Sequence, residues 1–508
     1  MSELLPHLQV SLPRRRAITV GLLLGMSLGA LEATVVGTAM PTVIATFGGL
    51  AHYSWVFSAY LLTSTASVPI WGRLSDLYGR RRMYLIGVAI FLVGSVMSGA
   101  ARSMTFLIVA RAIQGLGAGA IIPLSMTIIG ELYTLAERPR TQALFSGVWG
   151  VASIIGPLVG GYITDALSWR WVFYLNIPFA LFCMAVIGIA FPPSRDTKPV
   201  RVDWLGAGLL FSGVSALLIA LGGDTGAAAP WVLLTIVLLG WFVITERRAE
   251  EPILPVELLR HPVLSRTTVV VFLVGFALFG AIAFIPLFVQ GVMSGTATQA
   301  GQVLTPLFLG WVIMSVAGAK ATVLLGYRRV AITGSVLMTA GFLGLSLLSA
   351  ESTRTALLTA CFVIGAGMGC QMLTLLLAVQ HAVDRSRLGI ATSLNQFSRS
   401  IGAAIGVAAM GALMTRGLAG VVLPGGGRAG LTASGAMALS AVARGQFAVA
   451  LHSVFVAGTI VSGLGLIATF FLPHVDFAHQ VSAAAGERMI AAEMGNLEPE
   501  DEPVAVPE

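Results

Sequence analysis

Charged residues are scarce in this chain of 508 residues, in which Asp, Glu, Lys and Arg together make up 10%. Soluble domains average about 25% charged residues, so the composition excludes an ordinary soluble protein. Hydrophobic residues make up 56% of the chain, and the mean hydropathy is +0.89. The sequence is therefore that of a membrane protein with many spans.

Several kinds of functional motif are also absent. The three cysteines, Cys183, Cys361 and Cys370, lie in apolar runs, so we expect small core residues and no disulfide framework. The sequence has no Walker loop, no metal-ligand cluster and no nucleophile–base arrangement. These absences argue against a membrane enzyme or sensor and predict no bound metal. Alternating segments of about 10 residues, which are typical of membrane β-barrels, are missing as well.

Apolar runs long enough to cross a bilayer recur along the chain. About 20 apolar residues at roughly 1.5 Å each cover a hydrocarbon core of about 30 Å. We predict about fourteen spanning helices, with the expected ranges 17–40, 53–71, 83–101, 105–129, 141–167, 170–190, 204–221, 231–245, 267–291, 298–319, 330–350, 355–380, 388–415 and 447–472.

Basic residues are unevenly distributed between these runs. With the N-terminus placed inside, 22 of the 30 Lys and Arg residues lie in inside segments, 6 lie outside and 2 lie within spans. This bias predicts cytoplasmic termini and an even number of spans. The net charge of +7 is therefore a topology signal, and no nucleic-acid partner is expected. The first run exceeds the roughly 7–15 residues of a signal-peptide core, so no cleavable signal is expected.

Two short segments repeat about half a chain apart. Gly79–Gly87 (GRRRMYLIG) aligns with Gly326–Gly334 (GYRRVAITG), and Gly115–Gly119 (GLGAG) aligns with Gly365–Gly369 (GAGMG). The offsets of 247 and 250 residues are nearly equal. Parallel repeats of this kind predict a transporter made of two similar helix bundles around a midplane site.

These patterns divide the chain into parts. We predict an all-helical membrane fold with one six-helix bundle over 1–190 and a second over 267–473. Residues 191–266 would form a linker with two additional spanning helices and a cytoplasmic amphipathic segment. A Gly/Ala-rich external loop is expected over 416–444, and an acidic, disordered cytoplasmic tail over 474–508.

The first run, Ala17–Met40, contains one acidic residue, Glu32. A central acidic residue costs about 2.5–3.5 kcal/mol on insertion scales, so such residues usually face protein or water and have a function. We interpret Glu32 as a proton- or cation-binding carboxylate; the alternative is a Glu that only hydrogen-bonds a neighbouring helix. Arg111 in the fourth run lies at a similar depth, about 9–12 Å below the outer edge. The two side chains can meet if their helices are neighbours.

A basic segment, Gly72–Arg82 (GRLSDLYGRRR), joins the second and third runs. Its glycines allow a tight turn, and its one acidic residue, Asp76, is expected to form a charge-assisted network with the arginines. A positive-inside anchor explains the arginines but not the spacing. This spacing resembles the signature loop of the major facilitator superfamily, in which the loop acts as a cytoplasmic gate. The resemblance assigns that role to Gly72, Arg73, Asp76, Gly79 and Arg80.

Further motifs resemble the fourteen-span drug:proton antiporters of this superfamily. Leu31–Pro41 resembles their first-span element, with Glu32 where Asp is usual. Arg111–Gly115 (RAIQG) resembles an element linked to proton coupling. The segments Trp169–Pro178 and Ser393–Gly402 also resemble that subfamily. The fifth run resembles the antiporter element, and its matching residues are Gly156, Pro157, Gly160 and Gly161.

The resemblance implies the major facilitator fold with two extra central helices, and a proton-coupled antiporter that exports hydrophobic or amphiphilic drugs by alternating access. A carboxylate in low dielectric tends to take up a proton, and a nearby arginine favours its release. Cargo from the inside would displace the proton from Glu32, and rocking of the bundles would expose the site outward. Protons are the expected coupling ion, with Glu32 and Arg111 as coupling residues and no other cofactor.

Polar and aromatic residues within the runs are candidates for an otherwise apolar substrate cavity. Each one could instead lie in the core or face lipid. Arg399 would line the cavity or pair across the bundle interface, or else cap a backbone carbonyl. The candidates are Tyr60, Gln114, Trp149, Phe284, Gln290, Trp311, Asn395, Gln396 and Arg399.

Other cargoes fit the same fold, including a tetracycline-like drug, a lipid, a siderophore or a metabolite, and an uptake symporter is a further alternative. The tenth run has no acidic residue, which argues against divalent cations. The expected partners are a lipophilic small molecule, protons and membrane lipid. We expect a monomer in the bacterial cytoplasmic (inner) membrane.

Overall fold

The fold is known from a computed structural model, which describes residues 11–133, 137–192, 203–222, 228–249, 256–349, 351–383, 388–418, 430–431, 437–438 and 441–473. These residues are almost entirely helical. The only strands among them, β1 (Gly430–Leu431) and β2 (Met437–Ala438), pair with each other antiparallel. Thirteen of the described helical segments are long and apolar enough to cross a membrane.

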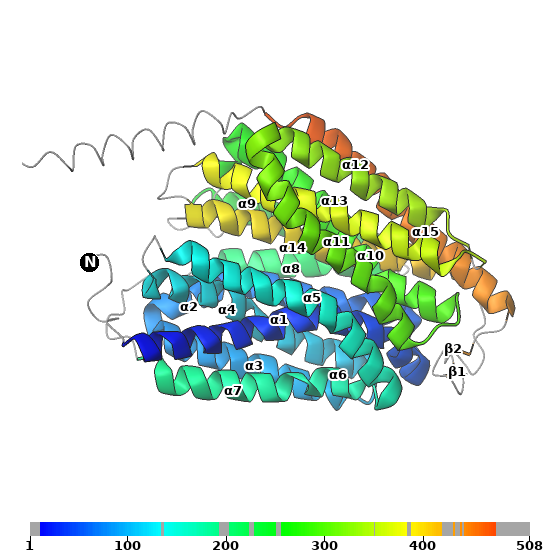
Figure 1. The fold of residues 1–508 in the computed structure, drawn as a ribbon, viewed down its shortest axis with the longest axis horizontal. Helices are drawn as coiled ribbons and strands as arrows, with labels where there is room; N and C mark the ends of the chain where they lie inside the picture. Colours follow the sequence, from blue (N-terminus) through cyan, green and yellow to red (C-terminus); the bar gives the residue numbers. More distant parts are fainter. Residues whose placement is uncertain are drawn as a thin grey trace, which may run out of the picture.

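The first bundle is built around α1, which packs against α4, α5 and α7, while α4 also packs against α2 and α3 (Figure 1). The short helix η2 (Leu50–His52) connects α1 to α2. The helices of this bundle are α1 (Leu12–Phe47), α2 (Tyr53–Tyr78), α3 (Arg80–Gly99), α4 (Met104–Leu132), α5 (Arg138–Ala166), α6 (Arg170–Tyr174) and α7 (Asn176–Ala190).

The second bundle is built around α10, which packs against α13, α14 and α15. Its helices are α10 (Pro262–Gly291), α11 (Ala297–Leu325), α12 (Tyr327–Ser346), α13 (Arg354–His381), α14 (Leu388–Gly417) and α15 (Ala441–Phe470), preceded by the short helix η3 (Val256–Arg260). Two further helices, α8 (Trp204–Gly222) and α9 (Ala228–Glu246), pack on each other, and α8 also contacts α2 and α14.

The described helices account for the predicted spans with three corrections. Helix α1 does not end before Pro41 but continues through it to Phe47, as proline is tolerated in membrane helices. The sixth span is divided into α6 and α7 at Leu175. Helix α2 is not among the thirteen strongly apolar segments because it is rich in Ser, Thr and Tyr, yet its 26 residues pack between helices of both bundles.

A one-residue turn occurs at the same place in both halves of the sequence repeat. Gly79 (φ +89°) is the single residue between α2 and α3, and Gly326 (φ +81°) is the single residue between α11 and α12. Only glycine adopts such positive φ angles without strain. Gly72 and Arg73 were predicted in this turn, but both lie within α2. The repeat seen in the sequence is therefore a repeat of backbone geometry.

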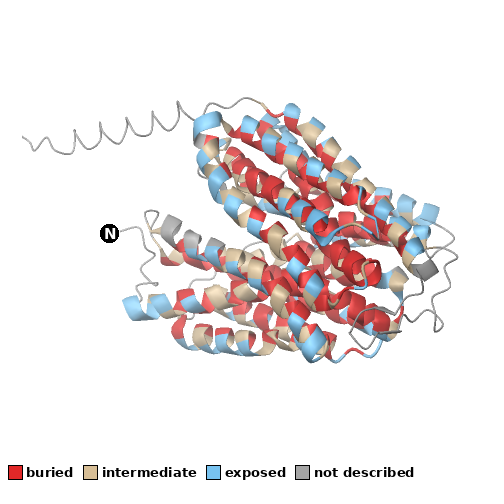
Figure 2. Cartoon of the chain, turned by 45° about the vertical axis from the view of Figure 1, so that its right-hand side comes forward, coloured by how far each residue is buried: buried red, intermediate tan, exposed pale blue. Residues whose placement is uncertain are grey.

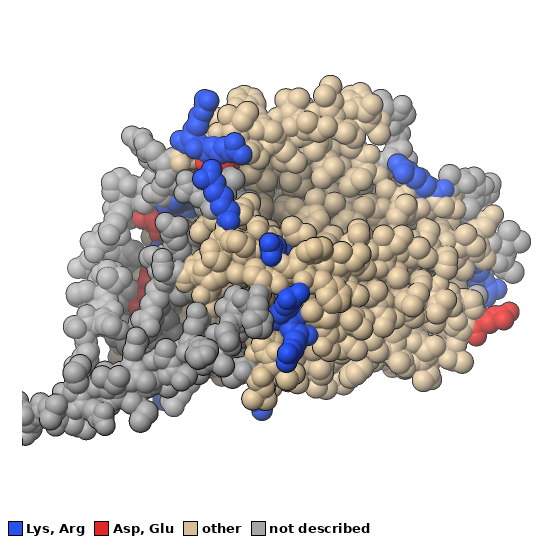
Figure 3. Space-filling view, turned by 90° about the horizontal axis from the view of Figure 1, so that it is seen from above, with Lys and Arg blue, Asp and Glu red and all other residues tan. Residues whose placement is uncertain are grey.

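The two ends of the molecule differ in charge. We call the end at which α1 begins the basic end, and the opposite end the far end. In Figure 3 Lys and Arg side chains gather on the left part of the surface, and a broad uncharged band separates them from the few charged groups at the right. The basic end holds Arg14, Arg15, Arg80, Arg81, Arg266 and Arg328.

The two bundles close on each other in the far half (Figures 1 and 2). Every residue of α1 from Thr34 to Ala45 and of α10 from Gly280 to Gly291 is buried. Toward the basic end the ribbons of the bundles diverge, and partly exposed residues such as Leu31 and Phe276 reappear on these helices. The structure thus has a closed far end and bundles that separate at the basic end.

Some predicted features fall largely outside the described residues. Of the predicted amphipathic segment, Glu246–Arg266, the structure describes the end of α9, the short helix Val256–Arg260 and the start of α10. Of the predicted external loop 416–444, the structure describes the ends of the flanking helices and the strand pair, and β1 and β2 both contact α1. The predicted tail 474–508 lies outside the described residues.

Candidate functional site

Glu32 lies on α1 with its side chain buried in the first bundle, at 3% exposure. Its Oε1 forms a salt bridge with Nη1 of Arg111 on α4. Its Oε2 accepts two hydrogen bonds, from Nε2 of Gln114 at 2.8 Å and from Nδ2 of Asn176 at 2.9 Å. The carboxylate therefore bridges α1, α4 and α7. The depth argument from the sequence had predicted the meeting of Glu32 and Arg111.

Arg111 has further partners besides Glu32. Its Nη1 also donates to Oε1 of Gln114 at 2.7 Å, and its Nε donates to the backbone oxygen of Val56 on α2 at 3.2 Å. The guanidinium carbon lies 4.3 Å from the centre of the Tyr60 ring, within the range of a cation–π contact. Two candidate cavity residues, Tyr60 and Gln114, thus belong to the wall of this buried charge pair.

Asn176 is the member of this network that sequence reasoning missed. It is the first residue of α7, directly after the break at Leu175, and it is 2% exposed. Its Nδ2 also donates to Oγ of Ser95 on α3 at 2.9 Å, and Ser95 donates to the backbone oxygen of Phe173 at 2.8 Å. The sequence signal for Asn176 is its place in the segment Trp169–Pro178, which resembles the fourteen-span antiporters.

The hydrogen bonds at Glu32 have a chemical consequence. All three partners donate N–H groups, and an ionised carboxylate is purely an acceptor. A protonated Glu32 would carry an O–H donor on one of the two oxygens that now receive N–H groups. Uptake of a proton would therefore weaken these contacts, above all the salt bridge to Arg111, because a neutral carboxyl group is a poorer acceptor than a carboxylate. This links the charge of Glu32 to the packing of three helices.

The predicted gate residues lie at the basic end within the first bundle. Nη1 of Arg80, on α3, is 2.5 Å from Oδ1 of Asp76 in the last turns of α2. Nε of Arg80 is 3.0 Å from Oε1 of Glu131 at the end of α4. This network ties three helices of one bundle together, and its action as a gate between the bundles stays a prediction.

The glycines of the antiporter element allow close helix contacts. A Cβ on Gly156 would overlap Thr34 on α1, and a Cβ on Gly160 would lie 2.6 Å from Val35. Gly161 meets the backbone of Ala297 on α11 in the other bundle. Pro157 approaches α11 as well, since a Cβ on Gly301 would overlap its backbone oxygen. The element therefore lies where α5 packs against both α1 and α11.

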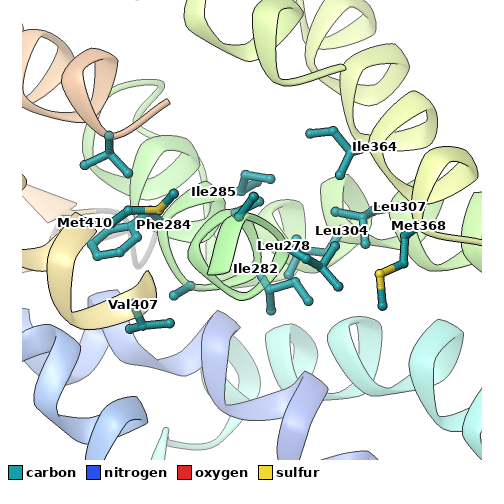
Figure 4. Close-up of a cluster of buried hydrophobic side chains, with 14 of the residues drawn as sticks. Leu278, Ile282, Phe284, Ile285, Leu304, Leu307, Ile364, Met368, Val407 and Met410 are labelled. Atoms are coloured by element: carbon teal, nitrogen blue, oxygen red, sulfur yellow. The ribbon is translucent and has the colours of Figure 1, made fainter. Parts of the chain in front are cut away.

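Two predicted cavity residues lie in the closed far half. Phe284 is fully buried beside Met410 in the apolar cluster around α10 (Figure 4). Gln290 is also fully buried, and its Nε2 donates to the backbone oxygen of Thr38 on α1 at 2.9 Å. In this conformation both residues join the bundles and do not line an open cavity. Trp149 is partly buried against the core of the first bundle, and Trp311 is partly buried against a larger core to which both bundles contribute.

The remaining candidates form a polar group on α14. Nη2 of Arg399 donates to Oε1 of Gln396 at 2.5 Å, and Nη1 points at Sδ of Met372 on α13 at 3.0 Å. Gln396 is exposed and Arg399 is partly buried. Nδ2 of Asn395 is buried without a hydrogen-bond partner. The alternative in which Arg399 caps a backbone carbonyl is not what these contacts show.

Comparison with known sequences identifies the family. The Major Facilitator Superfamily profile matches residues 22–407. The chain is 38% identical over 408 residues to the multidrug transporter protein MdtP of Bacillus subtilis, covering 79% of this chain and 75% of that protein. It is 34% identical over 406 residues to multidrug resistance protein 3 of the same organism, covering 78% of this chain and 79% of that protein.

Comparison with solved structures agrees at the level of the fold. A bacterial homologue of the human lysosomal transporter Spinster has a TM-score of 0.66 at 16% identity, covering 91% of this chain and 98% of that chain. A D-xylose–proton symporter has a TM-score of 0.61 at 14% identity, covering 90% of this chain and 96% of that chain. The chain therefore belongs to the major facilitator superfamily, as a multi-pass membrane transporter and not an enzyme.

Proposed function

We propose that this transporter is a proton-coupled antiporter that exports hydrophobic or amphiphilic compounds from the cytoplasm of a bacterium. Two relatives that cover more than three quarters of the chain are named as multidrug transport or resistance proteins, which supports the cargo class. The basic end would face the cytoplasm, because Lys and Arg concentrate on the inner side of membrane proteins. The structure would then be open to the side from which cargo is collected.

The observation that carries the proton coupling is the carboxylate network of Glu32. Glu32 is buried, and its carboxylate accepts hydrogen bonds from Arg111, Gln114 and Asn176. Neutralising this carboxylate removes the salt bridge to Arg111, so proton uptake would change how α1 packs against α4 and α7. Each proton moving inward supplies about 2.3 kcal/mol per 100 mV. It supplies a further 1.4 kcal/mol or so per pH unit.

The test uses the purified full-length protein in liposomes with an imposed pH gradient. Ethidium and an anionic dye, pyrenebutyrate, are followed together with proton flux for wild type and for Glu32→Gln. We expect wild type to couple proton influx to movement of at least one dye, and Glu32→Gln to lose net coupled transport by at least about 100-fold. Exchange of labelled for unlabelled dye, which needs no net proton movement, should persist in Glu32→Gln.

Three results would contradict the proposal in different ways. Wild-type protein that moves dye without protons would show a carrier without proton coupling. Coupled transport by Glu32→Gln at the wild-type rate would show that Glu32 only stabilises the bundle and that another acid, with Asp76 as the first candidate, takes the proton. Movement of proton and dye in the same direction would indicate an uptake symporter.

A further inference from the structure

We propose that Arg399, with Gln396 and Asn395, is the recognition site for an anionic group on the cargo, so that the preferred substrates are amphiphiles with a carboxylate or phosphate. This inference rests on the proposed export function and adds to it a substrate class. It is carried by three observations: the direction in which Gln396 points, the uncompensated charge of Arg399, and the excess of hydrogen-bond donors in the polar group on α14.

Within the polar group, Gln396 faces the interior between the bundles. On α14, Gly402 and Gly406 approach the backbone of α10, while Ala404 and Gly411 meet Ser58 and Ser54 of α2 in the first bundle. At 3.6 residues per turn, Gln396 lies about a quarter of a turn from each of these two faces, in the sector between them. It is nevertheless exposed, because it lies in the half of α14 where the bundles separate.

The charge of Arg399 is not compensated. Among the described residues, Glu32 and Arg111 neutralise each other, whereas Arg399 has no carboxylate within salt-bridge distance. Arg399 is 11 residues from the first residue of α14, about 16 Å along the helix and near the middle of the membrane. A cation at this depth is costly unless it meets a partner or water. An anionic cargo would supply that partner.

The chemistry of the group suits an acceptor. Arg399 has five N–H donors, of which one points at a thioether, a weak acceptor. Asn395, one helical turn before Arg399, has an amide nitrogen that donates to nothing. Gln396 already uses its oxygen as the acceptor for Arg399, which leaves its amide N–H groups for a ligand.

These features together define the ligand. A planar carboxylate or a phosphate can accept two hydrogen bonds from one guanidinium, which lysine cannot reproduce. Apolar residues adjoin the site, since Arg399 contacts Met372 on α13 and its backbone packs on Gly275 of α10. The site therefore fits the charged head of an amphiphile with an apolar body beside it. A positive charge in this position would be repelled.

The test compares two probes that share a pyrene ring and a butyl chain and differ in the head group, one a carboxylate and the other a trimethylammonium. KM for each is measured in proteoliposomes for wild type, Arg399→Gln, Arg399→Lys and the control Arg444→Gln. Arg444 is a matched control because it lies at the far end, where it donates to Ser294. A phosphate head and a pyrene-labelled phosphatidic acid form a second pair of probes, which separates free amphiphiles from membrane lipid.

We expect Arg399→Gln to raise KM for the carboxylate at least about tenfold and to lower or leave unchanged KM for the cation. Arg399→Lys should fall between wild type and Arg399→Gln, and Arg444→Gln should match wild type. An unchanged preference between the two heads in Arg399→Gln would overturn the assignment.

Movement of neither probe by wild type would contradict the export function itself. Equilibrium binding of the carboxylate probe to the detergent-purified protein then tests the site alone. At least tenfold weaker binding by Arg399→Gln would support the assignment, and equal binding would overturn it.

Discussion

At the residue scale, the site depends on one amide that bridges two oxygens. Nδ2 of Asn176 donates both to Glu32 and to Ser95, so it holds the carboxylate of α1 against α3 and α7. A hydrogen bond to a charged group contributes about 1.5–3 kcal/mol. Asn176 therefore adds a stabilising donor to the carboxylate beside those of Arg111 and Gln114.

Substitution of Asn176 by Ala should lower coupled transport by at least about tenfold. The reason is that Glu32 loses one of the two N–H donors that stabilise the carboxylate at its Oε2. Exchange of labelled for unlabelled cargo should be retained. Ser95→Ala is the matched control, since it removes the other partner of the same amide. Equal losses in exchange and in coupled transport would show that Asn176 only supports folding.

At the residue scale, prediction from the sequence succeeded for the buried charges and failed for the neutral residues around them. A buried carboxylate needs a cationic partner, and α1 packs against α4, so Glu32 meets Arg111. The role of Asn176 depends on which face of its helix meets α1 and α3, and an asparagine within an apolar run does not by itself reveal that face. Phe284 and Gln290 were expected in a cavity because residue type does not reveal which half of the interface is closed.

At the element scale, the far end is held by a carboxylate of one bundle at the start of a helix in the other. Asp165, near the end of α5, accepts hydrogen bonds from the backbone N–H groups of Ala297 and Thr298 at 3.1 and 2.7 Å. It also accepts one from the Thr298 hydroxyl at 2.5 Å. Anions are stabilised at helix N-termini, so this contact favours the closed far end.

Removal of this contact should shift the protein toward opening at the far end. In an Asp165→Ala variant, a cysteine at position 58, where Ser58 is 1% exposed, should react at least about fivefold faster with a membrane-impermeant maleimide added from the far side. The control is Thr164→Val, because Thr164 donates only within α5, to Gly160. Unchanged labelling in Asp165→Ala would show that glycine packing alone closes this end.

At the scale of the whole molecule, transport requires the two bundles to open at the far end and to close at the basic end. The far halves of α1 and α10 are joined by hydrogen bonds from Gln290 to Thr38 and from Thr42 to Gln290. The bundle arrangement could be predicted from the sequence because the repeat and the charge bias extend over the whole chain. The conformation could not be predicted, because the same sequence must support both closed ends.

A disulfide across the closed end should stop this exchange. Oxidation of a Thr42→Cys, Gln290→Cys double variant should abolish transport, and a reductant should restore it. Each single variant under the same oxidant is the control, and the three native cysteines are buried. Full transport by a completely cross-linked protein would mean that cargo crosses without separation of α1 from α10.

The matching one-residue turns at Gly79 and Gly326 also bear on the origin of the chain. Two units with the same internal turn and the same orientation are what a gene duplication leaves behind when the copied unit crosses the membrane an even number of times. The hairpin of α8 and α9 between the units also adds an even number of membrane crossings. A single inserted helix would have inverted the second unit. A helical hairpin is thus the smallest membrane-spanning insertion that evolution could have placed there.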